Sequence, residues 1–219
     1  MRRECGPPDD PNRMSQDAEL SCRCGQVRGR VKNAGPRTVN RVVCYCDDCQ
    51  AFLHHLGRAD LLDAHGGSDI VQVAPASLAF HQGTDRIVGL RLTPKGLYRW
   101  YASCCNTPAG NAVGPAIPFV GIIAGAFGGA TGGPDAIFGK PIAAIFGRYA
   151  IGTAPEGSTG WNVWLYARAI WMVLGWRLSG QAWPHPFFDR ATGAPSRPVT
   201  TLSPHERDAL RGPRVVAGA

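Results

Sequence analysis

Lysine is scarce in this sequence, where only Lys32, Lys95 and Lys140 occur although the formal net charge is +7. Arginine therefore supplies nearly all of the positive charge, and no run of five or more like charges is present. Scattered arginines are typical of a solvated surface, whereas proteins that follow a phosphate backbone carry a basic stripe or patch. We therefore do not expect nucleic acid as a partner, although single arginines can still bind the carboxylates of a small ligand.

A secretory leader and an uninterrupted membrane span are also missing. The first ten residues contain no apolar core, so we expect no signal peptide, a cytoplasmic location and reduced thiols. The best helical stretch, Trp161–Leu178, carries Arg168 near its middle, which would cost roughly 2.5–3.5 kcal/mol inside a bilayer. It predicts a buried or interface helix, with attachment to a membrane surface as the alternative. We favour the first interpretation and expect no membrane partner.

Composition divides the chain into three parts. Residues 1–17 are polar, rich in proline, aspartate and arginine, and predict a flexible N-terminal tail. Residues 18–115 contain short β-type runs that end at turn-forming residues and predict a β domain. Residues 116–219 begin as glycine-rich apolar sequence and predict a partly helical C-terminal extension that packs on that domain. The expected fold class is therefore mainly β.

The individual elements can be placed along the sequence. A short helix is expected within Gln50–Asp63, and another should begin after Ser203, which is followed by Pro204 and by Glu206 at the third position after the cap. The predicted strands are Val27–Val31, Thr38–Cys44, Ile70–Ala74, Leu78–His81, Arg86–Leu92 and Leu97–Ala102.

Eight cysteines are present, and seven of them fall in three short clusters. Zinc prefers a tetrahedral shell of thiolates, and cysteines separated by one or two residues can turn back on one ion. Disulfides within a Cys-x-Cys unit would be strained small rings, and unrelated buried cysteines rarely cluster in this way. We therefore predict one or two zinc ions per chain, and we regard Cys5 as a bystander in the tail. The predicted ligands are Cys22, Cys24, Cys44, Cys46, Cys49, Cys104 and Cys105.

These motifs resemble those of the glutathione-dependent formaldehyde-activating enzymes and their relative centromere protein V. The similarity covers about residues 18–115. It rests on Cys22-Arg23-Cys24-Gly25, on the cluster from Cys44 to Cys49, and on Arg99-Trp100-Tyr101 leading into the late cysteine pair. It implies a zinc-centred, Mss4-like β fold in which one structural zinc joins the first and last motifs. It also implies a second, more open zinc at the middle cluster, where the family binds a thiol substrate.

The late motif departs from the family pattern. The family usually has Cys-x-x-Cys followed by Gly, whereas this sequence reads Ala102-Ser103-Cys104-Cys105-Asn106. Adjacent side chains of a strand point to opposite faces, so both sulfurs reach one metal only if the chain bends there. Cys104 and Cys105 therefore serve either one ion or two.

The resemblance implies carbon–sulfur lyase chemistry at the second zinc. With Cys44, Cys46 and Cys49 as its protein ligands, that ion would keep a position open to water or to a substrate thiol. A metal-bound thiol loses its proton, and the thiolate is the species that attacks an aldehyde carbon. The expected reaction joins a thiol such as glutathione reversibly to formaldehyde, with these three cysteines as the catalytic residues.

Several charged and polar residues near the cysteines have open roles. Arg23 or Arg41 could offset the negative charge of the thiolates or hold substrate carboxylates. His54 or His55 could supply a fourth ligand or accept a proton, and the alternative is a plain surface position. The aspartates at 47 and 48 are expected to shape a turn.

A second hypothesis belongs to another class of protein. Zinc-containing β modules also act as non-catalytic domains that bind a protein partner or nucleic acid. The absence of a lysine-rich stripe counts against nucleic acid. The tryptophan-rich stretch in the second half favours contact with a protein, including a homo-oligomer formed through that half. Thiol-dependent aldehyde turnover would distinguish the enzyme from the module.

Overall fold

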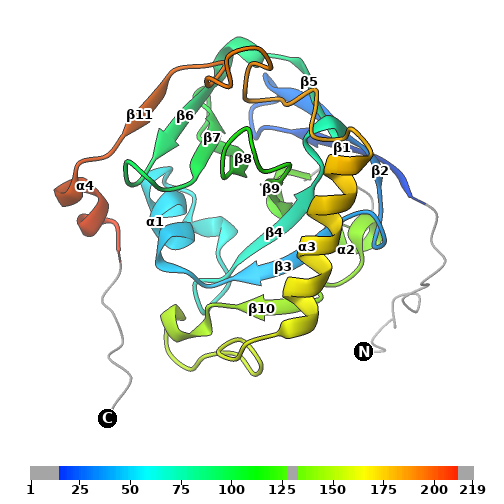
Figure 1. Ribbon diagram of the computed structural model, residues 1–219. Helices are drawn as coiled ribbons and strands as arrows, with labels where there is room; N and C mark the ends of the chain where they lie inside the picture. Colours follow the sequence, from blue (N-terminus) through cyan, green and yellow to red (C-terminus); the bar gives the residue numbers. More distant parts are fainter. Residues whose placement is uncertain (1–14, 128–132, 212–219) are drawn as a thin grey trace, which may run out of the picture.

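Two β-sheets form the framework of the protein in the computed structural model, which describes residues 15–127 and 133–211 (Figure 1). One sheet has three strands in the order β1-β2-β5, and the other has eight in the order β10-β3-β4-β9-β8-β7-β6-β11. The mainly β fold class predicted from the sequence is thereby confirmed. Four α-helices accompany the sheets in the described residues, and three of them lie beyond residue 115.

The bounds of the elements are as follows. The strands are β1 (Gln16–Ser21), β2 (Arg28–Ala34), β3 (Asn40–Cys44), β4 (Ser68–Val73), β5 (Leu78–Gln82), β6 (Ile87–Arg91), β7 (Tyr98–Ala102), β8 (Thr107–Ala112), β9 (Val120–Ile123), β10 (Ala143–Ile145) and β11 (Val199–Thr201). The α-helices are α1 (Asp47–His55), α2 (Gly133–Phe138), α3 (Val163–Leu178) and α4 (Pro204–Ala209). Short 3₁₀ turns are η1 (Ala59–Leu61), η2 (Pro75–Ser77), η3 (Thr84–Arg86), η4 (Ala124–Phe127) and η5 (Gly147–Tyr149).

The second half of the chain is part of the eight-stranded sheet. It supplies the inner strand β9, which pairs antiparallel with β4 and β8. It also supplies both outer strands, because β10 pairs in parallel with β3 and β11 pairs in parallel with β6. Residues 116–219 therefore complete the sheet of the first half as well as packing on it.

The six predicted strands all occur, but other elements differ from expectation. The first strand begins at Gln16, inside the predicted tail, whose residues 1–14 lie outside the described part of the chain. Helix α1 was misplaced: it begins at Asp47 and ends at His55, because Gly57 follows with φ 63° and turns the chain. Strand β8 was missed, since its sequence Thr-Pro-Ala-Gly-Asn-Ala has no alternation and every residue is buried.

Helices α3 and α4 agree with the sequence. Asn162 caps α3 by accepting a hydrogen bond from the N–H of Leu165 at 3.0 Å. Ser203 and Glu206 form the expected capping box at the start of α4, where each side chain accepts from the other's backbone N–H. Within the described residues, no helix combines the length and apolarity needed to cross a bilayer.

An aromatic stack joins the two halves in one core. Trp100 on β7 is completely buried, and its ring lies parallel to that of Phe187 with the centroids 4.9 Å apart. The ring of Phe188 meets Tyr98 edge-on at 5.0 Å. The segment after α3 therefore packs directly on the strand that leads to the late cysteine pair.

Replacing Phe187 with alanine should lower the free energy of unfolding by about 3–5 kcal/mol, because it leaves a cavity against Trp100. Chemical denaturation followed by tryptophan fluorescence and circular dichroism would measure the change. The matched control is Ile151→Ala, since Ile151 is 51 % exposed. A loss for F187A no larger than that of the control would show that this segment is not part of the core.

Candidate metal centres

Two hairpin turns bring four cysteines together in what we call the first group. The β1–β2 turn is closed by the N–H of Gly25, which donates to the carbonyl of Cys22 at 2.9 Å. Gly25 has φ 75°, a left-handed conformation that glycine adopts without strain. The N–H of Val27 also donates to the Sγ of Cys22 at 3.2 Å, so the backbone supports the sulfur. The group consists of Cys22, Cys24, Cys104 and Cys105.

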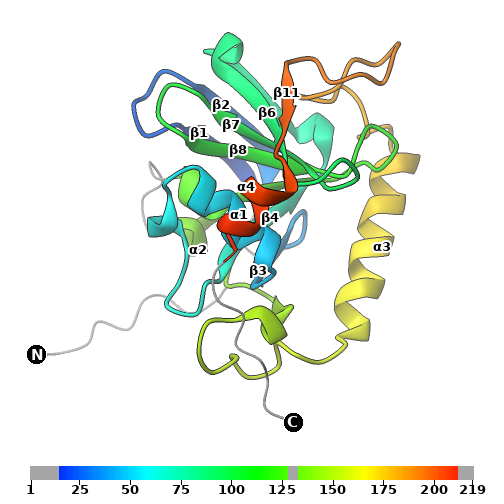
Figure 2. The same cartoon turned by 90° about the vertical axis from the view of Figure 1, so that its left-hand side faces the viewer.

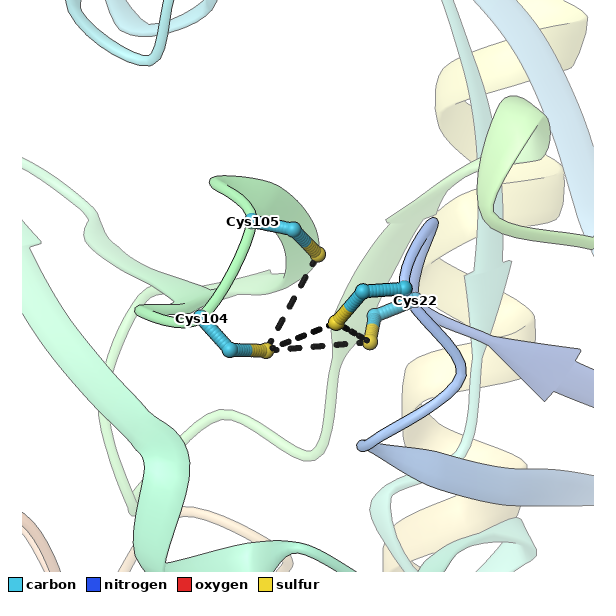
Figure 3. A group of neighbouring side chains, drawn as sticks. Cys22, Cys104 and Cys105 are labelled. Atoms are coloured by element: carbon cyan, nitrogen blue, oxygen red, sulfur yellow. Dashed lines mark hydrogen bonds between the residues drawn. The ribbon is translucent and has the colours of Figure 1, made fainter.

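The β7–β8 turn brings two adjacent cysteines to the same side of the chain. The N–H of Cys105 donates to the carbonyl of Ala102 at 3.3 Å, and Asn106 has φ 55°, which asparagine tolerates better than most residues. The chain bends between the strands, and Figure 3 shows both Cys104 and Cys105 facing Cys22. Of the two alternatives left open by the sequence, the structure brings both sulfurs into one group.

The sulfur separations of the first group fit a tetrahedral metal shell. They are 3.5 Å for Cys22–Cys24, 3.8 Å for Cys22–Cys104, 3.4 Å for Cys24–Cys104 and 3.9 Å for Cys104–Cys105. Four sulfurs about 2.3 Å from a central ion would lie about 3.8 Å apart. A disulfide would need about 2.05 Å, and all four cysteines are free thiols. The group is therefore compatible with metal binding.

Polar neighbours favour a thiolate in the first group. The Oγ1 of Thr107 lies 3.2 Å from the Sγ of Cys105 and accepts from the backbone N–H of Arg23 at 3.0 Å. The buried guanidinium of Arg58 also reaches this hydroxyl, at 3.4 Å. Burial by itself would raise the pKa of Cys105, but hydrogen bonds from Thr107 and from the Cys24 backbone lower it to about 6. One sulfur is thus ready to bind a cation at neutral pH.

The second group lies where β3 passes into α1. Cys44 is the last residue of β3, Cys46 is the N-cap of α1 and Cys49 lies in its first turn. The N–H groups of Cys49 and Gln50 both donate to the carbonyl of Cys46, at 3.0 and 3.2 Å. The sulfurs of Cys44 and Cys46 are 3.4 Å apart, and all three lie within 4.8 Å of one another. This group is also compatible with a metal, and the positive end of the helix favours thiolates there.

Arg99 is the charged residue that the sequence did not single out as a neighbour of the second group. It lies on β7 with 2 % of its surface exposed, and its Nη1 is 3.9 Å from the Sγ of Cys49. The guanidinium also lies over the ring of Phe52, 5.2 Å from the centroid. Among the described residues, no carboxylate forms an ion pair with it. A buried cation needs a negative partner, and the cysteine sulfurs are placed to supply one.

The thiols of the second group differ in their tendency to ionise. The pKa of Cys49 is held well below its ordinary value, because the thiols of Cys44 and Cys46 donate to its sulfur and Arg99 lies beside it. The pKa of Cys44 is raised, chiefly because its thiol donates to Cys46 and Cys49. Cys49, whose sulfur lies beside Arg99, is therefore the thiol of this group that ionises most readily.

The second half of the chain covers the second group. Leu165 of α3 belongs to the same buried cluster as Cys44 and Cys49, and Ile145 of β10 packs against that cluster. The carbonyl of Ile145 accepts from the N–H of Tyr45 at 3.0 Å. Cys46 keeps part of its surface exposed, whereas Cys44 and Cys49 are buried. Access to the group is thus from the side of Cys46.

The remaining predicted site residues lie elsewhere. His54 and His55 are exposed on α1, and the described part of the chain places neither with the cysteines. Arg41 is buried and pairs with Asp69 and Asp135, both at 2.6 Å, so its charge is already balanced. The backbone N–H of Arg23 donates to the Oγ1 of Thr107, beside the first group. The aspartates at 47 and 48 begin α1 instead of shaping a turn, and they pair with Arg211. Cys5 lies outside the described residues.

Replacing Cys104 or Cys105 with serine should remove the same metal ion, because both sulfurs belong to the first group. The expected result is loss of one ion per chain in C104S, in C105S and in the double variant alike. Elemental analysis of protein purified under reducing conditions would measure it. C46S is the matched control and should lose the other ion. Loss of two ions in the double variant would contradict the grouping.

Replacing Arg99 with leucine should weaken metal binding at the second group by about 10- to 100-fold, as for other residues that support metal ligands. The thiolates would lose their buried counter-charge, whereas Arg99→Lys keeps the charge and should retain part of the affinity. Competition with a chromogenic chelator would measure both, and the exposed Arg28→Leu serves as control. Unchanged affinity in a folded R99L protein would rule out this role.

Comparison with known proteins gives a family but no activity. A search of the curated proteins finds no match to the chain. A family described only as of unknown function, DUF6151, matches residues 14–199, which include all seven cysteines of the two groups and most of the second half. The chain belongs to the DUF6151 family.

Proposed function

We propose that this protein binds zinc and joins a small thiol such as glutathione reversibly to an aldehyde such as formaldehyde at the second group. The observation that carries the proposal is the convergence of three cysteine sulfurs beside the buried Arg99, with one of the three, Cys46, partly exposed. No other histidine, cysteine or carboxylate of the described residues joins these sulfurs. A fourth position is therefore available to a substrate.

The donor atoms favour zinc over other metals. Both groups offer only sulfur, which suits a soft, tetrahedral ion and not magnesium or calcium. The first group has four sulfurs and would be closed, as structural zinc sites are, whereas the second has three, as in a site that keeps a position for substrate. We assign the structural role to the first group and the reactive role to the second.

The proposed reaction is balanced without a further reactant. The thiol sulfur forms a bond to the aldehyde carbon, the carbon–oxygen π bond breaks, and the proton of the thiol ends on the oxygen. Zinc held at the second group would supply acidification of the substrate thiol. The reverse direction breaks the carbon–sulfur bond, so the activity is that of a carbon–sulfur lyase.

Arg99 offsets the negative charge that three thiolates would give the zinc site. Three protein thiolates around a divalent ion carry a net charge of −1, and the buried guanidinium beside Cys49 offsets it. A site that is neutral overall can accept an incoming thiolate at lower electrostatic cost than an anionic one. Arg99 thus acts as a positioning residue that holds the charge of Cys49 without touching the substrate.

The resemblance to the glutathione-dependent formaldehyde-activating enzymes and centromere protein V supports the same proposal. It rests on the three cysteine motifs in their order along the chain. The reactive thiols need a reducing environment, so we place the protein in the cytoplasm. The departure at Cys104-Cys105 concerns the first group and leaves the three sulfurs of the second group in place.

The zinc-loaded protein should accelerate the exchange between formaldehyde and its glutathione adduct, and C46S should return the rate to that of the uncatalysed reaction. Exchange measured by NMR with ¹³C-formaldehyde reports the rate directly. His54→Ala is the matched control, because His54 is exposed on the same helix and does not join the group. It should retain full activity.

Two outcomes would contradict the proposal. Protein with two ions per chain and no acceleration with glutathione, cysteine or coenzyme A would instead be a non-catalytic zinc module. Acceleration that survives in the C46S variant would place the chemistry outside the second group.

A further inference from the structure

The outer face of α3 exposes large apolar side chains over its whole length. Trp164 and Leu178, near its two ends, are 86 % and 88 % exposed, and Trp171 between them is 74 % exposed. Val163, Ile170 and Leu174 extend the same surface. Figure 2 shows α3 at the margin of the molecule, and no other element of the described chain covers its outer side.

The inner face fixes the orientation of the helix. Arg168 points inward, where it donates to the Oδ1 of Asn40 at 2.6 Å and to the carbonyls of Pro36 and Val39 at 3.1 and 3.2 Å. Leu165 and Trp176 are the buried residues of this face. Rotation about the helix axis would break these contacts, so the helix cannot bury its outer face against its own chain.

The spacing of the exposed residues is that of a coiled-coil seam. Trp164, Trp171, Leu174 and Leu178 follow one another at intervals of seven, three and four residues, and the half-buried Ala167 lies between the first two. Apolar residues repeating every 3.5 positions on average form a stripe that fits another helix bearing the same stripe. A second copy of this chain carries such a helix.

The exposed area approaches that of a stable interface. At about 200 Å² for a fully exposed tryptophan and about 100 Å² for an aliphatic side chain, the outer face presents about 600 Å². This is the upper end of the roughly 300–600 Å² found for the largest apolar patch on a typical monomer. Specific interfaces bury about 1,200–2,000 Å² in total, which is about 600–1,000 Å² per partner. The outer face thus reaches the lower end of the area that a dimer needs.

Charge argues against a membrane as the partner. Helices that lie on anionic membranes carry lysine or arginine along their polar face. In α3 the guanidinium of Arg168 is engaged on the inner side, and Arg177 donates to the carbonyl of Ala116 at 2.9 Å. No lysine occurs in the helix.

We propose that two copies of this chain associate through the outer faces of their α3 helices, packed antiparallel about a twofold axis near Trp171. This arrangement sets Trp164 over the partner's Leu178 and brings the two copies of Trp171 together. Antiparallel helices also pair opposite ends of their dipoles. Association does not depend on the proposed chemistry. It would nevertheless hold in place the helix that covers the second group.

Sedimentation velocity over a range of protein concentrations tests the proposal with the full-length, metal-loaded chain. The wild type should form a dimer, and Trp164→Ser with Trp171→Ser should weaken dimerisation by about 30-fold or more, as for hot-spot residues. Ile151→Ser, which changes an exposed apolar residue outside α3, should leave the dimer unchanged. Circular dichroism and metal content should be unaltered in all three proteins.

A wild type that is monomeric at every concentration would overturn the proposal. So would a dimer that the double tryptophan variant leaves intact, or a monomer that binds phosphatidylcholine vesicles through Trp164 and Trp171.

Discussion

Convergence of cysteine sulfurs from distant segments is the constraint around which this fold is arranged. Cys22 and Cys104 are 82 residues apart in sequence, and their sulfurs are 3.8 Å apart. The first lies beside a turn of the three-stranded sheet and the second in a turn of the eight-stranded sheet. An ion held at the first group would therefore join the two sheets, and its binding energy would contribute to folding. The turn conformations at Gly25 and Asn106 serve this convergence.

The two buried arginines of the larger sheet show what distinguishes the second group. Arg41 is balanced by two carboxylates and stabilises the contact between β3, β4 and α2. Arg99 is equally buried, and the described residues offer it a sulfur instead of a carboxylate. Its charge is satisfied when Cys49 is a thiolate. The cost of burying a cation thus favours the ionised sulfur that metal binding requires.

The second half of the chain gives this site its surroundings. Strand β10 extends the sheet beside β3, and Leu165 of α3 packs in the buried cluster that contains Cys44 and Cys49. The same helix turns its tryptophans outward. One face of α3 therefore shields the second group, and the opposite face exposes apolar side chains.

The sequence by itself determined the seven cysteines, the mainly β character, the strands β2 to β7 and the helices α3 and α4, because these depend on residue type and local spacing. The ends of α1, the strands β1 and β8 to β11, and the grouping of Cys104 with Cys105 depended on tertiary structure. Strand β8 forms because its small residues fit a crowded interior, where a Cβ at Gly110 would meet Phe187 at 2.8 Å. Arg99 became a site residue only when β7 was placed beside α1. Burial and charge balance are properties of the packed chain, and local sequence does not carry them.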